Sequence, residues 1–292
     1  MTLVVSLPDY SAAAQRLAVR LGIDYQPLKV HHFPDSEIRV HVPPLPPEHV
    51  ILCQSLDRPN DKLIALLLAC ATLRQLGTRR ISLVAPYLCY MRQDKAFHPG
   101  EAISQHIIGR FLAQLVDAVV TVDAHLHRIT SLDEAIPLET AINLSAAPAL
   151  GEFLARLDLQ PLLLGPDAES AQWVEQVAAA AGSDHVVATK QRFSDQDVRV
   201  ALPVRDYQDR VVILVDDVVS SGHTLAEAAK GLIAAGAREV HGLVTHALFA
   251  EGALDLMHAA GINTIWSSDS ISHETNAINL DVMLAATLTP LL

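Results

Sequence analysis

Short apolar runs alternate with longer helical patterns along the whole chain. Apolar periodicity predicts strands at residues 2–7, 50–54, 80–85, 118–122, 161–164, 211–215 and 239–245. Helices are predicted between most of them, most clearly at 9–21 and 61–76, where the pattern ends before Gly22 and Gly77. Continuous apolar strands separated by helices are typical of parallel sheets that helices cover on both faces. We therefore expect an α/β fold built from doubly wound parallel sheets.

The length of 292 residues suits two domains of about 150 residues each. The rhythm of the elements changes over residues 137–150, without a Gly/Ser-rich linker. We therefore expect an N-terminal domain at 1–143 and a C-terminal domain at 144–292. The two halves carry similar series of elements and are expected to be related, although no sequence repeat is strong enough to prove a duplication.

Composition and charge exclude several classes of protein. No charge-free apolar run reaches the about 20 residues of a membrane helix, and no export signal is visible at the start. A net charge of −12 disfavours nonspecific binding of nucleic acid. The three cysteines, Cys53, Cys70 and Cys89, are too scattered for a disulfide framework, so we expect a cytoplasmic protein that binds neither membrane nor nucleic acid.

The most specific chemistry lies where the strand at 211–215 ends in Asp216 and Asp217, followed by a polar loop at residues 220–224. In doubly wound sheets, ligands lie beyond the carboxyl ends of the strands. Amides at the start of the next helix, together with the loop hydroxyls, suit a phosphate, and Gly222 allows close approach of the backbone. The two aspartates would then bind ribose hydroxyls. The alternative is an ordinary strand–loop–helix turn with a capping hydroxyl.

This stretch resembles the phosphoribosyl-diphosphate motif shared by type I phosphoribosyltransferases and ribose-phosphate pyrophosphokinases. Four more segments resemble the pyrophosphokinases in the same order: FPDSEIRV (33–40), PYLCYMRQDKAFHPGEAIS (86–104), VDAHLH (122–127) and GPDAES (165–170). The resemblance implies a type I phosphoribosyltransferase-like fold in both domains. It also implies transfer of the β,γ-diphosphate of ATP to the anomeric hydroxyl of ribose 5-phosphate, giving 5-phosphoribosyl 1-diphosphate and AMP, with the simpler regulation of the shorter archaeal-type members.

The resemblance also assigns residues to the two substrates and to Mg²⁺. ATP would be held by the FxDGE-like and RQD-like segments, at Phe33, Asp35, Ser36, Glu37, Arg92, Gln93 and Asp94. Ribose 5-phosphate would be held at Asp216, Asp217, Ser220, Ser221, Gly222, His223 and Thr224. His125 and Asp167 would be associated with Mg²⁺, and Lys190 and Arg192 of ATKQRFSDQDV (188–198) would be catalytic. Family members form homo-oligomers, so at least a dimer is expected.

The chain departs from the family pattern at two loops. Ser220 and His223 replace a third aspartate and a second glycine in the 220–224 loop, and Glu169 and Ser170 replace paired glycines. Two alternatives therefore stay open. One is a type I phosphoribosyltransferase, which usually needs only one domain. The other is a non-catalytic regulatory homologue, whose mark would be loss of the residues at Lys190 and Arg192, both of which are present.

Overall fold

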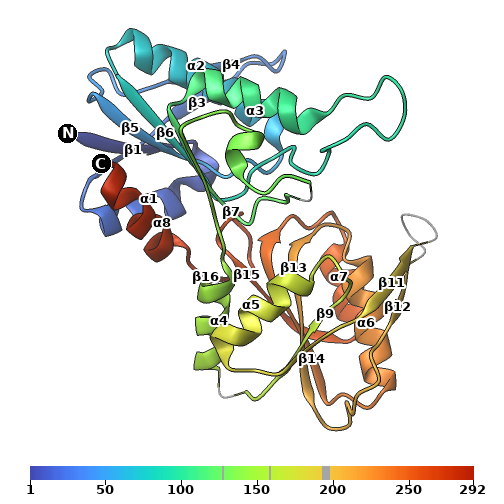
Figure 1. Cartoon of the computed structure of the whole chain (residues 1–292). Helices are drawn as coiled ribbons and strands as arrows, with labels where there is room; N and C mark the ends of the chain where they lie inside the picture. The colour runs from blue at the N-terminus through green and yellow to red at the C-terminus, as the bar shows by residue number, and fades with distance from the viewer. Residues whose placement is uncertain (127, 158, 193–197) are drawn as a thin grey trace. The chain divides into compact units, whose positions relative to one another are not determined.

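The computed structural model describes residues 1–126, 128–157, 159–192 and 198–292, with the side chains of 190–192, 198 and 199 left out. The chain forms two compact units (Figure 1). Unit 1 comprises residues 1–144 and 280–292, and unit 2 comprises residues 145–279.

Unit 1 is built on a six-stranded parallel sheet in the order β2-β1-β5-β6-β7-β8. Its strands are β1 (Thr2–Ser6), β2 (Asp24–Pro27), β5 (His49–Cys53), β6 (Arg80–Ala85), β7 (Ala118–Val122) and β8 (Thr140–Leu144). A separate hairpin pairs β3 (Lys29–His32) with β4 (Ile38–His41). The helices are α1 (Ser11–Leu21), α2 (Pro59–Gln75), α3 (Ser104–Leu115) and α8 (Asp281–Leu288), with 3-10 turns at Pro8–Tyr10, Leu132–Glu134 and Thr289–Leu291. Figure 1 shows α2 and α3 on one face of the sheet, and α1 and α8 on the other.

Unit 2 repeats this plan with the strand order β10-β9-β13-β14-β15-β16, again parallel throughout. Its strands are β9 (Leu162–Gly165), β10 (His185–Val187), β13 (Val211–Val219), β14 (Glu239–Ala247), β15 (Ile262–Ser268) and β16 (Asn276–Ile278). A hairpin pairs β11 (Thr189–Arg192) with β12 (Val198–Ala201). The helices are α4 (Ala147–Arg156), α5 (Ala171–Ala181), α6 (His223–Ala234) and α7 (Ala253–Ala259). The expectation of two related doubly wound parallel-sheet domains is confirmed.

Central strands form because both of their faces are buried. Every residue of β5 and β7 is buried, as a continuous apolar run predicts for an interior parallel strand. Helix α1 ends where glycine follows it in the sequence. Gly22 caps the helix with a φ of 67°, in the left-handed region that favours glycine.

The structure differs from the expected domain boundaries at the end of the chain. Residues 280–292 were placed with the C-terminal domain, but they belong to unit 1. There α8 packs along α1, and Arg20 Nε donates to Asp281 Oδ2 at 3.0 Å. The physical reason is the apolar side of α8, which places Leu284 and Leu288 in the buried interior.

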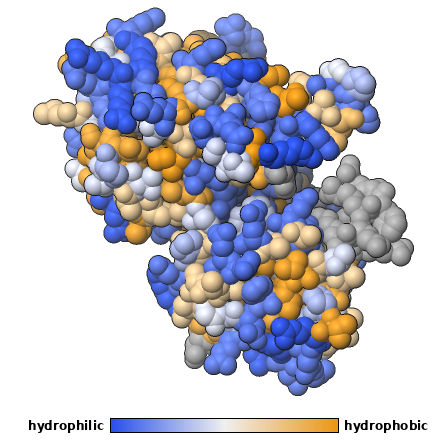
Figure 2. Space-filling view, in the orientation of Figure 1, coloured by the Kyte–Doolittle hydropathy of each residue, from blue (hydrophilic) through white to orange (hydrophobic). Residues whose placement is uncertain are grey.

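The surface mixes polar and apolar side chains on the face shown in Figure 2. One helix is unusual: α2 exposes Ile64, Leu67 and Leu68 on its outer side. No helix in the described part of the chain is both long and apolar enough to cross a membrane. All three cysteines are buried, and burial raises the pKa of Cys70 and of Cys89 to about 12.

Candidate active site

Two neighbouring strands of unit 2 deliver carboxylates to one edge of the sheet. β9 pairs with β13 in parallel, so their carboxyl ends lie together. Asp167 follows β9, and Asp216 and Asp217 lie within the last part of β13. That strand was predicted to end at residue 215, but it continues to Val219 because it stays paired with β14. The pairing of the two strands therefore brings these three acids together, although Asp167 is distant from the other two in sequence.

Burial and the neighbouring negative charges both act on the carboxyl group of Asp216. The side chain keeps some accessible surface but is crowded by protein atoms. This loss of water, together with the charges of Asp217 and Asp167, raises the pKa of Asp216 well above its ordinary value. The site is therefore prepared for hydrogen-bond donors or a cation, and sugar hydroxyls and Mg²⁺ belong to those classes.

The 220–224 loop joins β13 to α6, and its shape depends on Gly222. This residue caps α6 with a φ of 75°, and a Cβ there would lie 3.0 Å from Met257 Cγ and 3.2 Å from the Ala253 carbonyl oxygen. A second contact fixes the loop from behind, because the Ala250 amide donates to the Ser220 carbonyl at 2.9 Å. Helix α6 begins at His223, so amides of its first turn face the loop. Sequence reasoning missed Met257 and Ala250, which carry no motif.

Asp167 is held by its own turn. Its Oδ1 accepts from the amides of Glu169 at 3.0 Å and Ser170 at 3.1 Å, and the Ser170 hydroxyl donates to the Asp167 carbonyl at 2.7 Å. Gly165 makes room for this turn, because a Cβ there would lie 2.6 Å from Ser170 Oγ. The replacement of a family glycine by Ser170 therefore adds a side chain that ties the turn together.

The hairpin β11–β12 carries the two residues expected to be catalytic. Lys190 pairs with Val200, and Arg192 with Val198. The hairpin leaves the sheet beside Asp167, since the Ala188 amide donates to the Gly165 carbonyl at 2.8 Å. The side chains of Lys190 and Arg192 lie outside the described residues.

The expected ATP residues Phe33, Asp35, Ser36 and Glu37 lie together at the tip of the β3–β4 hairpin in unit 1. Phe33 is 39% exposed, its ring centroid lies 4.7 Å from that of His31 in a T-shaped arrangement, and the Arg39 guanidinium lies 6.0 Å from the Phe33 centroid. Ser36, at the glycine of the FxDGE-like motif, has a φ of 72°. The tip is closed by the Phe33 amide, which donates to the Glu37 carbonyl at 2.8 Å.

The other expected ATP residues, Arg92, Gln93 and Asp94, lie in the loop between β6 and α3. Arg92 is exposed, whereas the Asp94 side chain is only 4% exposed and accepts from Arg128 Nη1 at 2.9 Å. Asp94 therefore holds the loop through an ion pair. Arg128 was not identified from the sequence, because no local pattern links residues so far apart in the chain.

His125 lies in the loop after β7 of unit 1, whereas Asp167 lies in unit 2. Within the described ranges, no three His, Cys, Asp or Glu side chains are grouped closely enough to hold a metal ion by themselves. The carboxylate oxygens of Asp167, Asp216 and Asp217 are of the chemical type that Mg²⁺ prefers, and Mg²⁺ often keeps waters and substrate phosphates as further ligands.

The two doubly wound sheets and the 220–224 loop define a two-domain protein of the phosphoribosyltransferase fold class. Residues 143–275 match the family model for the phosphoribosyl transferase domain, and residues 2–115 match that for the N-terminal domain of ribose phosphate pyrophosphokinase. The chain is 33% identical to ribose-phosphate pyrophosphokinase 2 of Archaeoglobus fulgidus, with 97% of this chain and 98% of the relative covered. It is 30% identical to the ribose-phosphate pyrophosphokinase of Methanopyrus kandleri, with 95% of each covered. This chain therefore belongs to the ribose-phosphate pyrophosphokinase family.

The crystal structure of phosphoribosylpyrophosphate synthetase from Mycobacterium smegmatis has the same fold. The TM-score is 0.82 at 21% identity, over 100% of this chain and 99% of that one. The recognition of the family from ordered motifs is confirmed, and so is the expectation of an enzyme.

Proposed function

We propose that this protein transfers the β,γ-diphosphate of ATP to the anomeric hydroxyl of ribose 5-phosphate, giving 5-phosphoribosyl 1-diphosphate and AMP. The observation that carries the proposal is the cluster at the carboxyl ends of β9 and β13, where Asp167, Asp216 and Asp217 lie beside the 220–224 loop. Membership of the pyrophosphokinase family and the second domain favour this reaction over that of a single-domain phosphoribosyltransferase.

Ribose 5-phosphate fits this cluster through complementary chemistry. Asp216 and Asp217 accept hydrogen bonds from ribose hydroxyls, and these donors offset the burial and the neighbouring negative charges that raise the pKa of Asp216. The 5-phosphate lies against the amides at the start of α6, with Ser220, Ser221, Gly222, His223 and Thr224 around it.

ATP is assigned to the hairpin tip and the RQD-like loop of unit 1. The exposed ring of Phe33 offers a stacking surface for adenine, while Asp35, Ser36 and Glu37 read its edge. Exposed Arg92 supplies a planar fork for phosphate, and Gln93 lies next to it. Asp94 contributes by shaping the loop through its ion pair with Arg128.

Mg²⁺ is the metal that this proposal requires. Asp167 and His125 are each assigned to association with Mg²⁺, for which substrate phosphates would be further ligands. When bound, the ion neutralises charge on the diphosphate that moves.

The reaction forms one P–O bond and breaks another. The anomeric oxygen attacks the β-phosphorus of ATP, the bond from that phosphorus to the oxygen bridging it to the α-phosphorus breaks, and AMP leaves while the hydroxyl loses its proton. Positioning of two anions and stabilisation of charge on the diphosphate are what the protein supplies. Lys190 and Arg192, on β11, are assigned to this stabilisation.

The protein is also proposed to form a homo-oligomer and to lie in the cytoplasm. The exposed side of α2, with Ile64, Leu67 and Leu68, supports a homo-oligomer of at least two chains, since apolar patches of this kind mark protein interfaces. Three buried cysteine thiols are compatible with the cytoplasm.

The decisive experiment mixes the protein with ATP, Mg²⁺ and ribose 5-phosphate, and follows AMP and phosphoribosyl diphosphate by chromatography. Equal amounts of both products are expected. Lys190→Ala should lower kcat by about 10³-fold, and Lys230→Ala, which removes an exposed lysine of α6, should leave it unchanged. Consumption of phosphoribosyl diphosphate with a nucleobase would point to a transferase instead. Absence of turnover under all nucleotide, metal and phosphate conditions would point to a regulatory homologue.

A further inference from the structure

Unit 1 has its own topological switch point, between β1 and β5. From β1 the chain continues to β2 on one side of the sheet, and it later enters β5 on the other side. In doubly wound sheets the crevice at such a point is where ligands bind. The equivalent point of unit 2 lies between β9 and β13 and carries the cluster described above. The proposed reaction assigns no substrate to the switch point of unit 1.

A pocket of about 390 Å³ lies at this position, bordered by the loop after β1, the inner side of the β3–β4 hairpin and the first turns of α2. Much of its wall is apolar, with Leu7, Val30, Ile38 and Ala65 contributing. This volume lies within the range of about 300–1,000 Å³ that is typical of small-molecule sites.

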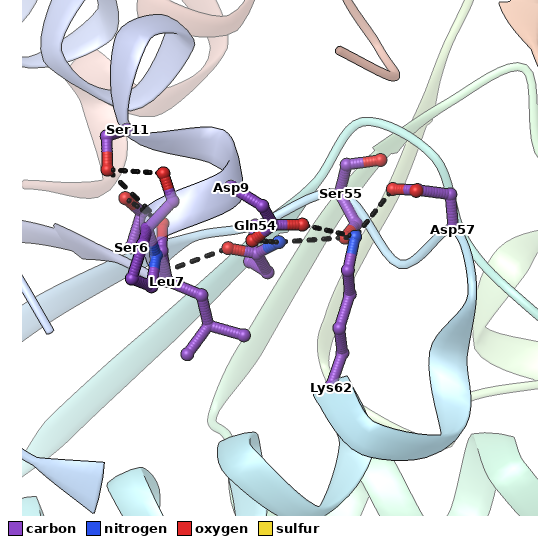
Figure 3. Close-up of polar contacts among 9 residues, drawn as sticks. Ser6, Leu7, Asp9, Ser11, Gln54, Ser55, Asp57 and Lys62 are labelled. Carbon is purple, nitrogen blue, oxygen red and sulfur yellow. Dashed lines mark hydrogen bonds and ion pairs between the residues drawn. The ribbon is translucent and has the colours of Figure 1, made fainter. Parts of the chain in front are cut away.

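Apart from His32, the charged residues in the described lining of the pocket are Asp9, Asp61 and Lys62, and the charge of Lys62 is already neutralised. Lys62 Nζ lies 2.7 Å from Asp9 Oδ2 and 2.7 Å from Asp57 Oδ1, and donates to the Ser55 carbonyl at 3.0 Å (Figure 3). An ammonium group has three donors, so these contacts use them all. Gln54 Nε2 also donates to Asp9 Oδ1 at 3.1 Å, which fixes that carboxylate.

The exposed carboxylate of Asp61 also lines the pocket. Asp9 and Asp61 thus both line the pocket, and the one ammonium beside them is shared between Asp9 and Asp57. A phosphate would be repelled here, in contrast to the 220–224 loop of unit 2, whereas a cation is attracted.

We propose that this pocket binds a small aliphatic amine in its cationic form. The hydrocarbon body lies against Leu7, Val30, Ile38 and Ala65, and the ammonium group is paired with Asp61 and Asp9. Such a ligand matches both halves of the site, because methylene groups gain from burial on the apolar wall and an ammonium supplies only donors.

Calorimetric titration with 1,4-diaminobutane tests the proposal, with butane-1,4-diol as an uncharged probe of the same length. The diamine should bind and the diol should not. Asp61→Asn should weaken the diamine by about threefold or more. Asp24→Asn removes the same charge at the first residue of β2. This residue lies at the amino-terminal end of the strands, whereas the pocket lies at their carboxyl ends, so the affinity should be unchanged.

Methyl NMR locates the ligand, because signals of Leu7, Ile38 and Ala65 should shift on addition of the diamine. Equal binding of diol and diamine, an unchanged affinity in Asp61→Asn, or shifts confined to other methyl groups would each overturn the proposal. The titration contains neither ATP nor ribose 5-phosphate, so its outcome is independent of the proposed reaction.

Discussion

The shape of the proposed ribose 5-phosphate site depends on the absence of a side chain at Gly222. Gly222→Ala places a methyl group 3.0 Å from Met257 Cγ in a backbone with a φ of 75°. The loop must shift, so KM for ribose 5-phosphate should rise about tenfold, because small displacements of positioning groups have large effects. Gly252→Ala is the matched control, since its φ is 78° but nothing lies within 4 Å of an added Cβ. Both variants should lose about 1 kcal/mol of stability, but steady-state kinetics should show a raised KM for ribose 5-phosphate only in Gly222→Ala.

The raised pKa of Asp216 can be tested through the pH dependence of the protein's stability. An acid with a raised pKa holds its proton more tightly in the folded protein, so stability falls as the pH rises from its ordinary pKa towards the raised one. Asp216→Asn removes this penalty. At pH 7.5 the unliganded variant should melt about 2–4 °C higher, as expected for about 1 kcal/mol.

The difference in melting temperature should shrink as the pH falls towards about 4, where the wild-type carboxyl is protonated as well. Asp184→Asn, at an exposed position of the same unit, should show no such trend. A difference that stays constant with pH would contradict the raised pKa of Asp216, and with it the effect of burial and of the neighbouring carboxylates.

Among the elements, most interior strands could be predicted and the edges could not; the interior strand β15, whose burial pattern is mixed, was missed. The continuous apolar runs at β6 and β7 were found with their observed bounds, because burial on both faces leaves only one pattern. Edge strand β2 reads DYQP, and its mixed polarity gives no strand signal. The two hairpins were missed for the same reason, although motifs on them were recognised.

The Lys62 network, formed by Asp9, Gln54, Ser55, Asp57 and Lys62, joins the ends of β1 and β5 to α2. The Lys62 side chain is 12% exposed. Lys62→Ala leaves Asp9 and Asp57 without their shared cation, so it should lower the free energy of unfolding by about 1–2 kcal/mol, since Asp9 is half exposed. Lys230→Ala removes an exposed pair with Glu227 and should cost less than about 0.5 kcal/mol. Urea denaturation measures both, and equal losses would mean that the network is as weak as a surface pair.

At the scale of the whole molecule, the same topology occurs twice with different chemistry at the switch point. Unit 2 combines carboxylates with the helix amides and hydroxyls of the 220–224 loop, while unit 1 combines carboxylates with an apolar wall. Ordered motifs revealed the first site, because Asp216, Asp217 and Gly222 are neighbours in sequence. The second could not be predicted, because Asp9 and Lys62 come together only through the crossover between β1 and β5.

The return of the chain end to unit 1 makes α8 part of the first domain's stability. Leu284 is buried and Val282 is 59% exposed on the same helix, which packs on α1. Leu284→Ala should cost about 2–4 kcal/mol through the cavity it leaves, and Val282→Ala should cost less than about 0.5 kcal/mol. Hydrogen exchange should show faster exchange in α1 and β1 of Leu284→Ala, with β13 and β14 unchanged. Loss of protection in β13 instead would mean that α8 stabilises unit 2, as the boundary at residue 143 had implied.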